Sequence, residues 1–162
     1  MVDVGCAIGD LVAEWLKRGV DAMGIEGSHA AKPYLMAPEE SILFADLRDP
    51  LPQLRKFDLC TCFEVAEHIE PEYADIFVKS ITGLSDRILI SLAPPNQAGT
   101  HHVNCRSIGY WMEIFDAFGF KMDGNVRRTI RSELCALRHK PGIRAIYFNV
   151  AYFERGLDCS IC

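Results

Sequence analysis

The sequence predicts an α/β protein built on a doubly wound, mostly parallel β-sheet. Short apolar runs, typical of buried strands, alternate along the chain with segments whose apolar residues recur at helical spacing. Neither an internal repeat nor a low-complexity segment interrupts this alternation. A chain in which strands alternate with helices forms a parallel sheet that is covered on both faces.

Four strands and one helix are expected in the first part of the chain. Residues 2–5 and 57–63 are short apolar runs, and a third run at 41–46 lies between them. The segment 11–19 places its apolar residues on one helical face and ends at a glycine, which is a helix stop signal. Residues 21–26 form the remaining strand and, like 41–46, end in an acidic residue.

The second part of the chain is expected to continue the alternation. Residues 70–84 predict a helix, because a proline suits the first turn and the apolar residues form one stripe. A fifth strand is expected at 87–93 and a second amphipathic helix at 106–120, where a glycine closes the helix. The stretch from 120 to 140 is ambiguous, with a short helix at 129–137 as the best interpretation. Residues 145–155 are expected to form one long final strand.

Length and composition indicate a single domain at residues 1–155 and a C-terminal tail at 156–162. The 162 residues are 49% hydrophobic and 24% charged, which is ordinary for a soluble globular protein. We expect neither a membrane span nor a secretory signal. The seven cysteines are odd in number and several lie in apolar runs, so we expect reduced, mostly buried thiols in a cytoplasmic protein. Cys159 and Cys162 form a CxxC without a second pair, which does not favour a zinc site.

Charge is distributed unevenly along the chain. The net charge is −5, yet residues 1–120 hold nine Lys and Arg against eighteen Asp and Glu, whereas residues 121–162 hold eight against four. The basic residues of the last third could form a patch for an anionic partner, or a solvated helix face with charged sheet edges. The acidic whole argues against a dedicated nucleic-acid binder. These basic residues are Arg127, Arg128, Arg131, Arg138, Lys140, Arg144 and Arg155.

Gly5 and Gly9 follow the first predicted strand, where glycines let the backbone approach a ligand closely. Ligands of doubly wound sheets bind at the carboxyl ends of the strands, where the strand order reverses. A dinucleotide site needs a third glycine at a fixed spacing, and none follows here. Asp10 also places negative charge where a pyrophosphate would bind. The turn therefore argues against a nicotinamide cofactor.

The segment DVGCAIGD (3–10) resembles the first motif of the class I S-adenosylmethionine-dependent methyltransferases, in the small-molecule, type 11 or type 23 group. The resemblance continues in order through Glu26 in MGIEGS, Asp46 in FADL and CFEVAEHI (62–69). It implies a Rossmann-like methyltransferase fold with a seven-stranded sheet and an antiparallel final strand. It also implies S-adenosyl-L-methionine as cofactor and S-adenosyl-L-homocysteine as product. The cofactor-binding residues that it implies are Asp3, Gly5, Cys6, Gly9, Glu26, Gly27, Asp46, Leu47, Phe63 and Glu64.

The resemblance also gives roles to single residues. It makes Glu26 the acceptor for the ribose hydroxyls and Asp46 the acceptor for the adenine amino group. The acids near the turn are favourable neighbours for a cofactor that carries ammonium and sulfonium groups instead of a pyrophosphate. Ala7 stands where the commonest family motif has a third glycine. Most relatives carry helices before the first strand, so we expect a minimal form with an open cofactor cleft, which a homodimer or a partner chain would close.

The acceptor side is less defined by the sequence. Methyl transfer requires alignment of acceptor and methyl group and, for some acceptors, removal of a proton. His101 and His102 in the loop PPNQAGTHHVN (94–104) are the candidate catalytic bases, with His101 preferred; the structural alternative is that both bond to backbone. His68 suits packing as well as ligand contact. We expect a small-molecule acceptor with an oxygen nucleophile and no metal. Two alternatives are a nucleic-acid or other macromolecular methyltransferase and a non-catalytic subunit with this fold.

Overall fold

The computed structural model describes residues 1–156, in which seven strands form one sheet. The strands are Val2–Val4 (β1), Met23–Glu26 (β2), Ile42–Phe44 (β3), Cys60–Cys62 (β4), Arg87–Ser91 (β5), Phe120–Met122 (β6) and Val150–Arg155 (β7). Their order across the sheet is β3-β2-β1-β4-β5-β7-β6. The five strands from β3 to β5 pair in parallel, whereas β7 runs antiparallel to both β5 and β6. The predicted doubly wound, mostly parallel sheet with an antiparallel final strand is confirmed.

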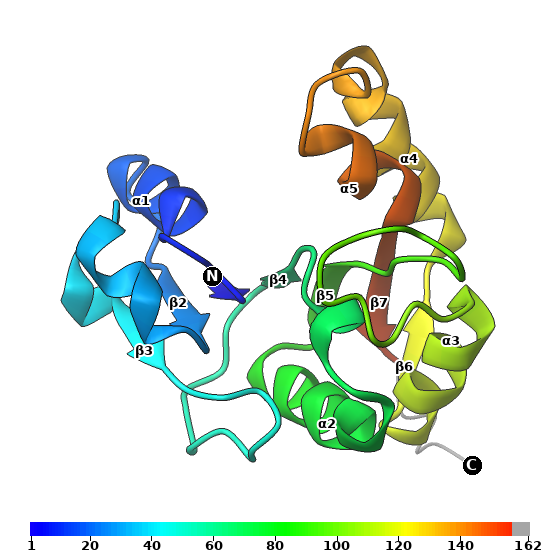
Figure 1. Cartoon of the computed structure of the whole chain (residues 1–162), viewed down its shortest axis with the longest axis horizontal. Helices are drawn as coiled ribbons and strands as arrows, with labels where there is room; N and C mark the ends of the chain where they lie inside the picture. The colour runs from blue at the N-terminus through cyan, green and yellow to red at the C-terminus, as the bar shows by residue number, and fades with distance from the viewer. Residues whose placement is uncertain (157–162) are drawn as a thin grey trace.

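Helices connect the strands, as Figure 1 shows. Side chains define where two of them begin: Ser107 accepts a hydrogen bond from the Tyr110 N–H, and Asp123 accepts from the N–H groups of Asn125 and Val126. None of the described helices is both long and apolar enough to cross a membrane. The α-helices are Asp10–Lys17 (α1), Ala74–Leu84 (α2), Ile108–Ala117 (α3), Gly124–Leu134 (α4) and Ile143–Asn149 (α5). The 3₁₀ segments are His29–Tyr34 (η1), Glu39–Ser41 (η2), Ala66–His68 (η3), Pro71–Tyr73 (η4) and Cys135–Leu137 (η5).

Three elements of the last third differ from the sequence prediction. The helix expected at 129–137 begins at Gly124, because Asp123 caps it five residues earlier than the apolar pattern suggested. Residues 143–149 are helical, so the long strand expected at 145–155 exists only from Val150 onward. Strand β6 was not predicted, because Phe120 was assigned to the helix at 106–120, which ends at Ala117, and the stretch after it was ambiguous. The remainder of the tail, including Cys159 and Cys162, lies outside the described residues.

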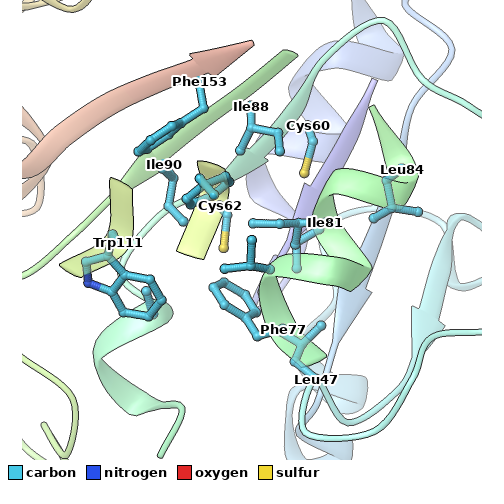
Figure 2. Packing of buried hydrophobic residues seen from close by; sticks show 14 of the residues in the cluster. Leu47, Cys60, Cys62, Phe77, Ile81, Leu84, Ile88, Ile90, Trp111 and Phe153 are labelled. Carbon is cyan, nitrogen blue, oxygen red and sulfur yellow. The ribbon is translucent and has the colours of Figure 1, made fainter. Parts of the chain in front are cut away.

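The main core lies between the sheet and helices α2 and α3, as Figure 2 shows. Trp111 and Phe115 of α3 are fully buried, and the Phe115 ring stacks on Phe153 of β7 with centroids 3.9 Å apart. Cys60 and Cys62 of β4 are fully buried within the same core as free thiols. Burial raises the pKa of both thiols, so they stay protonated, as expected of structural cysteines.

The strand order places a binding site at the carboxyl ends of β1 and β4. Strand β1 pairs with β2 on one side and with β4 on the other, and the chain proceeds outward from β1 in both directions. The connections that follow β1 and β4 therefore diverge to opposite faces and leave a crevice between them, which is where doubly wound sheets bind ligands. The local geometry of this edge determines what can bind.

Candidate functional site

The turn between β1 and α1 has three residues in the left-handed backbone region. The φ angles are +74° at Gly5, +50° at Ala7 and +73° at Gly9. A Cβ atom on Gly5 would lie 2.2 Å from Cγ2 of Val65, so this position accepts no side chain for steric as well as conformational reasons. Ala7 adopts its conformation at a cost of about 1–2 kcal/mol. The backbone of the turn thus passes so close to neighbouring side chains that Gly5 has no space for a side chain of its own.

Glu26, at the end of β2, holds this turn in place. Its Oε2 accepts a hydrogen bond from the Ala7 N–H at 2.8 Å, and its Oε1 accepts from the Ser28 N–H at 2.7 Å. A carboxylate offers about four acceptor positions, so two remain free. The half-buried side chain can therefore fix the loops and still accept two hydroxyl donors from a ligand.

Asp3 lies inside β1 and is almost completely buried. Its Oδ1 accepts a hydrogen bond from the Thr61 hydroxyl at 2.5 Å. Burial raises the pKa of Asp3 to about 6, and the negative charges of Asp10 and Glu26 act in the same direction. A carboxylate held in this way is energetically costly, and a cation placed beside it would be strongly attracted.

Asp46, just after β3, is already engaged by a neighbouring side chain. Both of its carboxylate oxygens accept hydrogen bonds from the Arg48 guanidinium, at 2.6–3.1 Å, and Oδ1 also accepts from the Arg48 N–H. These hydrogen bonds hold the pKa of Asp46 below its ordinary value. Asp46 is thus a fixed anion, and an adenine amino group would share it with Arg48.

Two cavities meet at the glycine turn, with volumes of about 590 Å³ and about 300 Å³. Both are lined by Gly5, Ala7 and Glu64, so they are two halves of one cleft. The larger half lies between α1 on one side and α4 and α5 on the other, because residues of all three helices line it. Figure 1 shows α4 and α5 across from α1. The further lining of the larger half comes from Asp3, Cys6, Asp10, Leu11, Phe63, Leu89, Ile130, Leu134, Pro141, Gly142, Ile143, Ile146 and Val150. The smaller half is completed by Glu26, Gly27, Asp46, Leu47, Val65, His68 and Ile69.

The structure brings nine of the ten predicted cofactor residues to this cleft. Gly9 is the exception, since it is buried, and a Cβ on it would lie 3.1 Å from that of Ala37. Neither His101 nor His102 is among the residues that line the two cavities. His101 is exposed and its carbonyl oxygen lies 3.1 Å from Nδ1 of His68, which does line the smaller half.

Sequence reasoning missed the wall formed by α4 and α5. Ile130, Leu134, Ile143 and Ile146 face the larger cavity. A signal existed in α4, because Val126, Ile130 and Leu134 recur at four-residue spacing, which is one face of a helix. The short apolar run of α5 is compatible with either a helix or a strand, so the sequence alone could not predict a helix there.

The charged side chains that line the cleft are acidic, and one of them, Asp46, is paired with Arg48. Asp3, Asp10, Glu26, Asp46 and Glu64 all contribute to its lining, whereas no Lys or Arg side chain is found among the residues described as lining either half. A pyrophosphate would be repelled here. The cleft instead suits a ligand with positive charge and hydroxyl donors, such as a sulfonium and an ammonium group joined to a nucleoside.

The family model described as "Methyltransferase domain" matches residues 2–84, which is just over half of the chain. The chain belongs to this methyltransferase family. The match and the fold confirm the resemblance to class I S-adenosylmethionine-dependent methyltransferases, and with it S-adenosylmethionine as the family's cofactor. No curated protein sequence matches the chain.

Solved methyltransferase structures share the fold. Magnesium protoporphyrin IX methyltransferase (ChlM) from Synechocystis PCC 6803 with bound SAM aligns with a TM-score of 0.58 at 22% identity, over 75% of this chain and 59% of that chain. The same enzyme with bound SAH aligns with a TM-score of 0.61 at 18% identity, over 96% of this chain and 73% of that chain. The methyltransferase domain of bacterial CtHen1-C aligns with a TM-score of 0.63 at 14% identity, over 96% of this chain and 89% of that chain. This methyltransferase chain therefore spans less than two thirds of the length of the SAM-bound ChlM chain.

Proposed function

We propose that this chain transfers the methyl group of S-adenosylmethionine to an oxygen nucleophile of a small, largely apolar acceptor. The observation that carries the proposal is the cleft of two halves that meet at Gly5, Ala7 and Glu64. One half offers hydrogen-bond acceptors for a nucleoside, and the other combines acids near the turn with an apolar wall. The boundary between them is where a methyl group would pass from donor to acceptor.

The smaller half suits the adenosine part of the cofactor. Glu26 keeps two free acceptor positions for the ribose hydroxyls, and Asp46 lies along the same half for the adenine amino group. Leu47 and Ile69 give this half apolar surface for the adenine ring. Asp3 and Asp10 lie on the other side of the turn, where they attract the ammonium group of the methionine part.

The larger half suits a small acceptor with an apolar body. Its far wall consists of aliphatic side chains from α4 and α5, and its volume is in the range of small-molecule sites. When bound, the cofactor supplies an activated methyl carbon, whose bond to sulfur breaks as an acceptor oxygen attacks. The chain's own contribution is to align the acceptor against the turn, to exclude water with the apolar wall and to accept or release the hydroxyl proton.

The basic side chains of the last third favour a small acceptor over a nucleic acid. Arg127 donates to the Val150 carbonyl at 2.7 Å, and Arg138 donates to the Cys135 carbonyl at 2.6 Å. Arg155 pairs with Asp86 at 2.7 Å. These groups hold α4, η5 and β7 in place, which leaves fewer of them free for phosphate contacts than the sequence count suggested.

Cofactor binding is tested by calorimetric titration of the intact chain with S-adenosylhomocysteine. Glu26→Ala removes the ribose acceptor, and two hydrogen bonds to a charged group account for about 3 kcal/mol or more, so we expect affinity to fall by about 100-fold or more. Glu40→Ala, which removes an exposed glutamate that lines neither half of the cleft, is the matched control and should bind like the unaltered chain. Absence of binding by the unaltered chain at high ligand concentration would refute the proposal.

The acceptor is tested by a screen with S-adenosylmethionine labelled in its methyl group. Hydroxylated aromatic or aliphatic compounds small enough for the larger half are compared with RNA and DNA. Label transfer to a hydroxyl compound supports the proposal, whereas salt-dependent transfer to nucleic acid supports the macromolecular alternative. Cofactor binding without turnover of any acceptor would indicate the non-catalytic subunit.

A further inference from the structure

Three side chains outside the predicted cofactor set converge beside the smaller half of the cleft. Glu67 and His68 belong to η3, which follows β4, and His102 belongs to the loop that follows β5. One ligand-capable atom from each lies within 4.8 Å of those of the other two. The two imidazole rings meet edge to face, with centroids 5.1 Å apart. We call Glu67, His68 and His102 the EHH cluster.

Glu67 is the unusual member of the EHH cluster. Its side chain is 1% exposed, and neither carboxylate oxygen accepts a hydrogen bond from any residue that the structure describes. Burial raises the pKa of Glu67, and the nearby Glu64 carboxylate adds to this effect. A buried carboxylate without a partner costs several kcal/mol, and buried charges are normally paired or bound to a metal. The described residues therefore supply no hydrogen-bond donor to the Glu67 carboxylate, and the imidazoles of His68 and His102 are its neighbours in the cluster.

Both histidines have one ring nitrogen occupied and one free. Nδ1 of His68 lies 3.1 Å from the His101 carbonyl oxygen, and Nδ1 of His102 lies 3.2 Å from the Gln97 carbonyl oxygen. A carbonyl oxygen only accepts, so each Nδ1 carries the proton and donates it. In the neutral form of each ring, Nε2 then keeps its lone pair. Metal-binding histidines have this arrangement, in which a backbone carbonyl orients the ring and fixes the tautomer.

Backbone contacts hold the loop of His102 against η3. The N–H groups of Val103 and Asn104 both donate to the Glu67 carbonyl, at 2.9 and 3.0 Å. Gly99 packs on the His102 ring, where a Cβ would lie 2.2–2.5 Å from Nε2, Cε1 and Cδ2. Because the three distances are similar, Gly99 lies over the face of the His102 ring. The position in the ring plane beyond Nε2, where a metal ion would bind, is therefore not occupied by Gly99. The cluster is preorganised by its surroundings.

We propose that the EHH cluster binds one divalent transition-metal ion, such as Zn²⁺ or Co²⁺, at the edge of the cofactor cleft. Two imidazoles and one carboxylate are the donor set that such ions prefer, whereas Mg²⁺ and Ca²⁺ prefer oxygen ligands alone. Ligand atoms around a tetrahedral zinc ion are about 3.3 Å apart, given metal–ligand distances of about 2.0–2.1 Å. Because the ligand atoms lie within 4.8 Å of one another, their separations would shorten by at most about 1.5 Å on metal binding. The three protein ligands leave at least one coordination position open.

The open position gives the ion a role that rests on the proposed function. An acceptor hydroxyl that coordinates the ion has a lowered pKa, so its proton is released to solvent water. The resulting oxyanion attacks the methyl carbon, and the electrons of the broken carbon–sulfur bond pass to sulfur. His68 lines the smaller half, and Glu64, whose carboxylate lies near Glu67, lines both halves, so an acceptor in the larger half would have to reach past Glu64 to coordinate the ion. In this arrangement His68 and His102 hold the ion, and neither is a free base.

Metal binding is tested without any turnover. The full chain is treated with a chelator, dialysed and titrated with CoCl₂, and the visible absorption of coordinated Co²⁺ is followed. We expect one ion per chain, with imidazole and carboxylate ligation, and displacement by one equivalent of Zn²⁺. Absence of coordinated Co²⁺ would overturn the proposal. Strong sulfur-to-cobalt charge transfer would also overturn it, because the ion would then be bound by cysteine.

Variants locate the ion. Glu67→Gln keeps the size of the side chain and removes its charge. Loss of a residue that only orients a metal ligand lowers metal affinity by about 10–100-fold, so loss of the ligand itself should lower Co²⁺ affinity by about 100-fold or more. His102→Gln, on the loop, should give the same result and serves if Glu67→Gln does not fold. His139→Ala removes an exposed histidine far along the chain and should bind Co²⁺ unchanged. Equal loss in His139→Ala and His102→Gln would indicate surface binding only and overturn the assignment.

Titration with S-adenosylhomocysteine separates this proposal from the proposed function. If the cofactor product binds and Co²⁺ does not, the metal site is wrong and the methyltransferase proposal stands. If Co²⁺ binds and the cofactor product does not, the metal site stands without its catalytic role. If both bind, methyl transfer to a hydroxyl acceptor should fall at least tenfold on chelation and return on addition of Zn²⁺ or Co²⁺.

Discussion

Asp3 gives the sharpest quantitative prediction, because its carboxyl group is buried and its pKa lies at about 6 instead of 3.8. Above pH 6 the group is charged in both the folded and the unfolded chain, and the folded state bears the full desolvation penalty. As the pH falls from about 6 to about 4, the folded chain takes up a proton before the unfolded chain does. The contribution of Asp3 therefore becomes less unfavourable toward acid pH.

The magnitude follows from the difference between a pKa of about 6 in the folded chain and the ordinary value of 3.8. Each unit corresponds to 1.36 kcal/mol, so the charged Asp3 destabilises the folded chain by about 3 kcal/mol at pH 8. Asp3→Asn removes the charge and retains an oxygen that can accept the Thr61 hydroxyl. We expect the variant to exceed the unaltered chain in free energy of unfolding by about 2–3 kcal/mol at pH 8 and by almost nothing at pH 4.

The assay is urea unfolding of both chains at several pH values. The difference between them isolates Asp3 from acids such as Asp46 and Asp86, whose lowered pKa values make their contributions disappear as the pH falls. A difference that is equal at pH 4 and pH 8, or a variant that is less stable at pH 8, would contradict the reasoning. The same group predicts that affinity for S-adenosylhomocysteine falls below pH 6 by up to about tenfold per pH unit, because the ammonium group favours the charged carboxylate.

Four further substitutions test the turn, strand β2 with the residue that follows it, and the apolar wall of the larger half. Ala7→Gly relieves a left-handed alanine and should raise the free energy of unfolding by about 0.5–1 kcal/mol in the same urea assay. Gly24→Ala places a Cβ 2.5 Å from Sγ of Cys6 and should destabilise by about 1–3 kcal/mol, whereas Gly27→Ala meets no atom closer than 3.8 Å and should change little. Ile146→Asn makes the far wall polar and should raise KM for an apolar acceptor, with unchanged calorimetric affinity for S-adenosylhomocysteine.

The convergence of most of the proposed cofactor residues could be predicted, because the residues that the family resemblance implies lie at or near the ends of parallel strands. Gly5, Glu26, Asp46 and Glu64 follow or end β1, β2, β3 and β4, and parallel strands bring their carboxyl ends to one edge of the sheet. Locating the strands was therefore enough to bring these residues to one edge of the sheet. Their interpretation as cofactor-binding residues depended on the family resemblance.

The EHH cluster shows why the catalytic side was harder to predict. His101 and His102 are neighbours in the sequence, yet only His102 joins Glu67 and His68, while His101 turns outward with φ of +56°. Which of two adjacent side chains faces inward depends on the backbone conformation of an irregular loop. Strand pairing of β4 with β5 predicts that the loops meet, but not which residues of each loop face one another.

The two halves of the cleft also come from different parts of the chain, and this explains why the family does not reveal the acceptor. The family match ends at residue 84, and the smaller half is built entirely before that point. The apolar wall of the larger half comes from α4 and α5, beyond residue 120. Changes in this wall alter the acceptor pocket without touching the side chains that line the smaller half. Acceptor specificity is therefore expected to depend on residues such as Ile130, Leu134, Ile143 and Ile146, whose exchange should change the preferred acceptor while cofactor affinity stays constant.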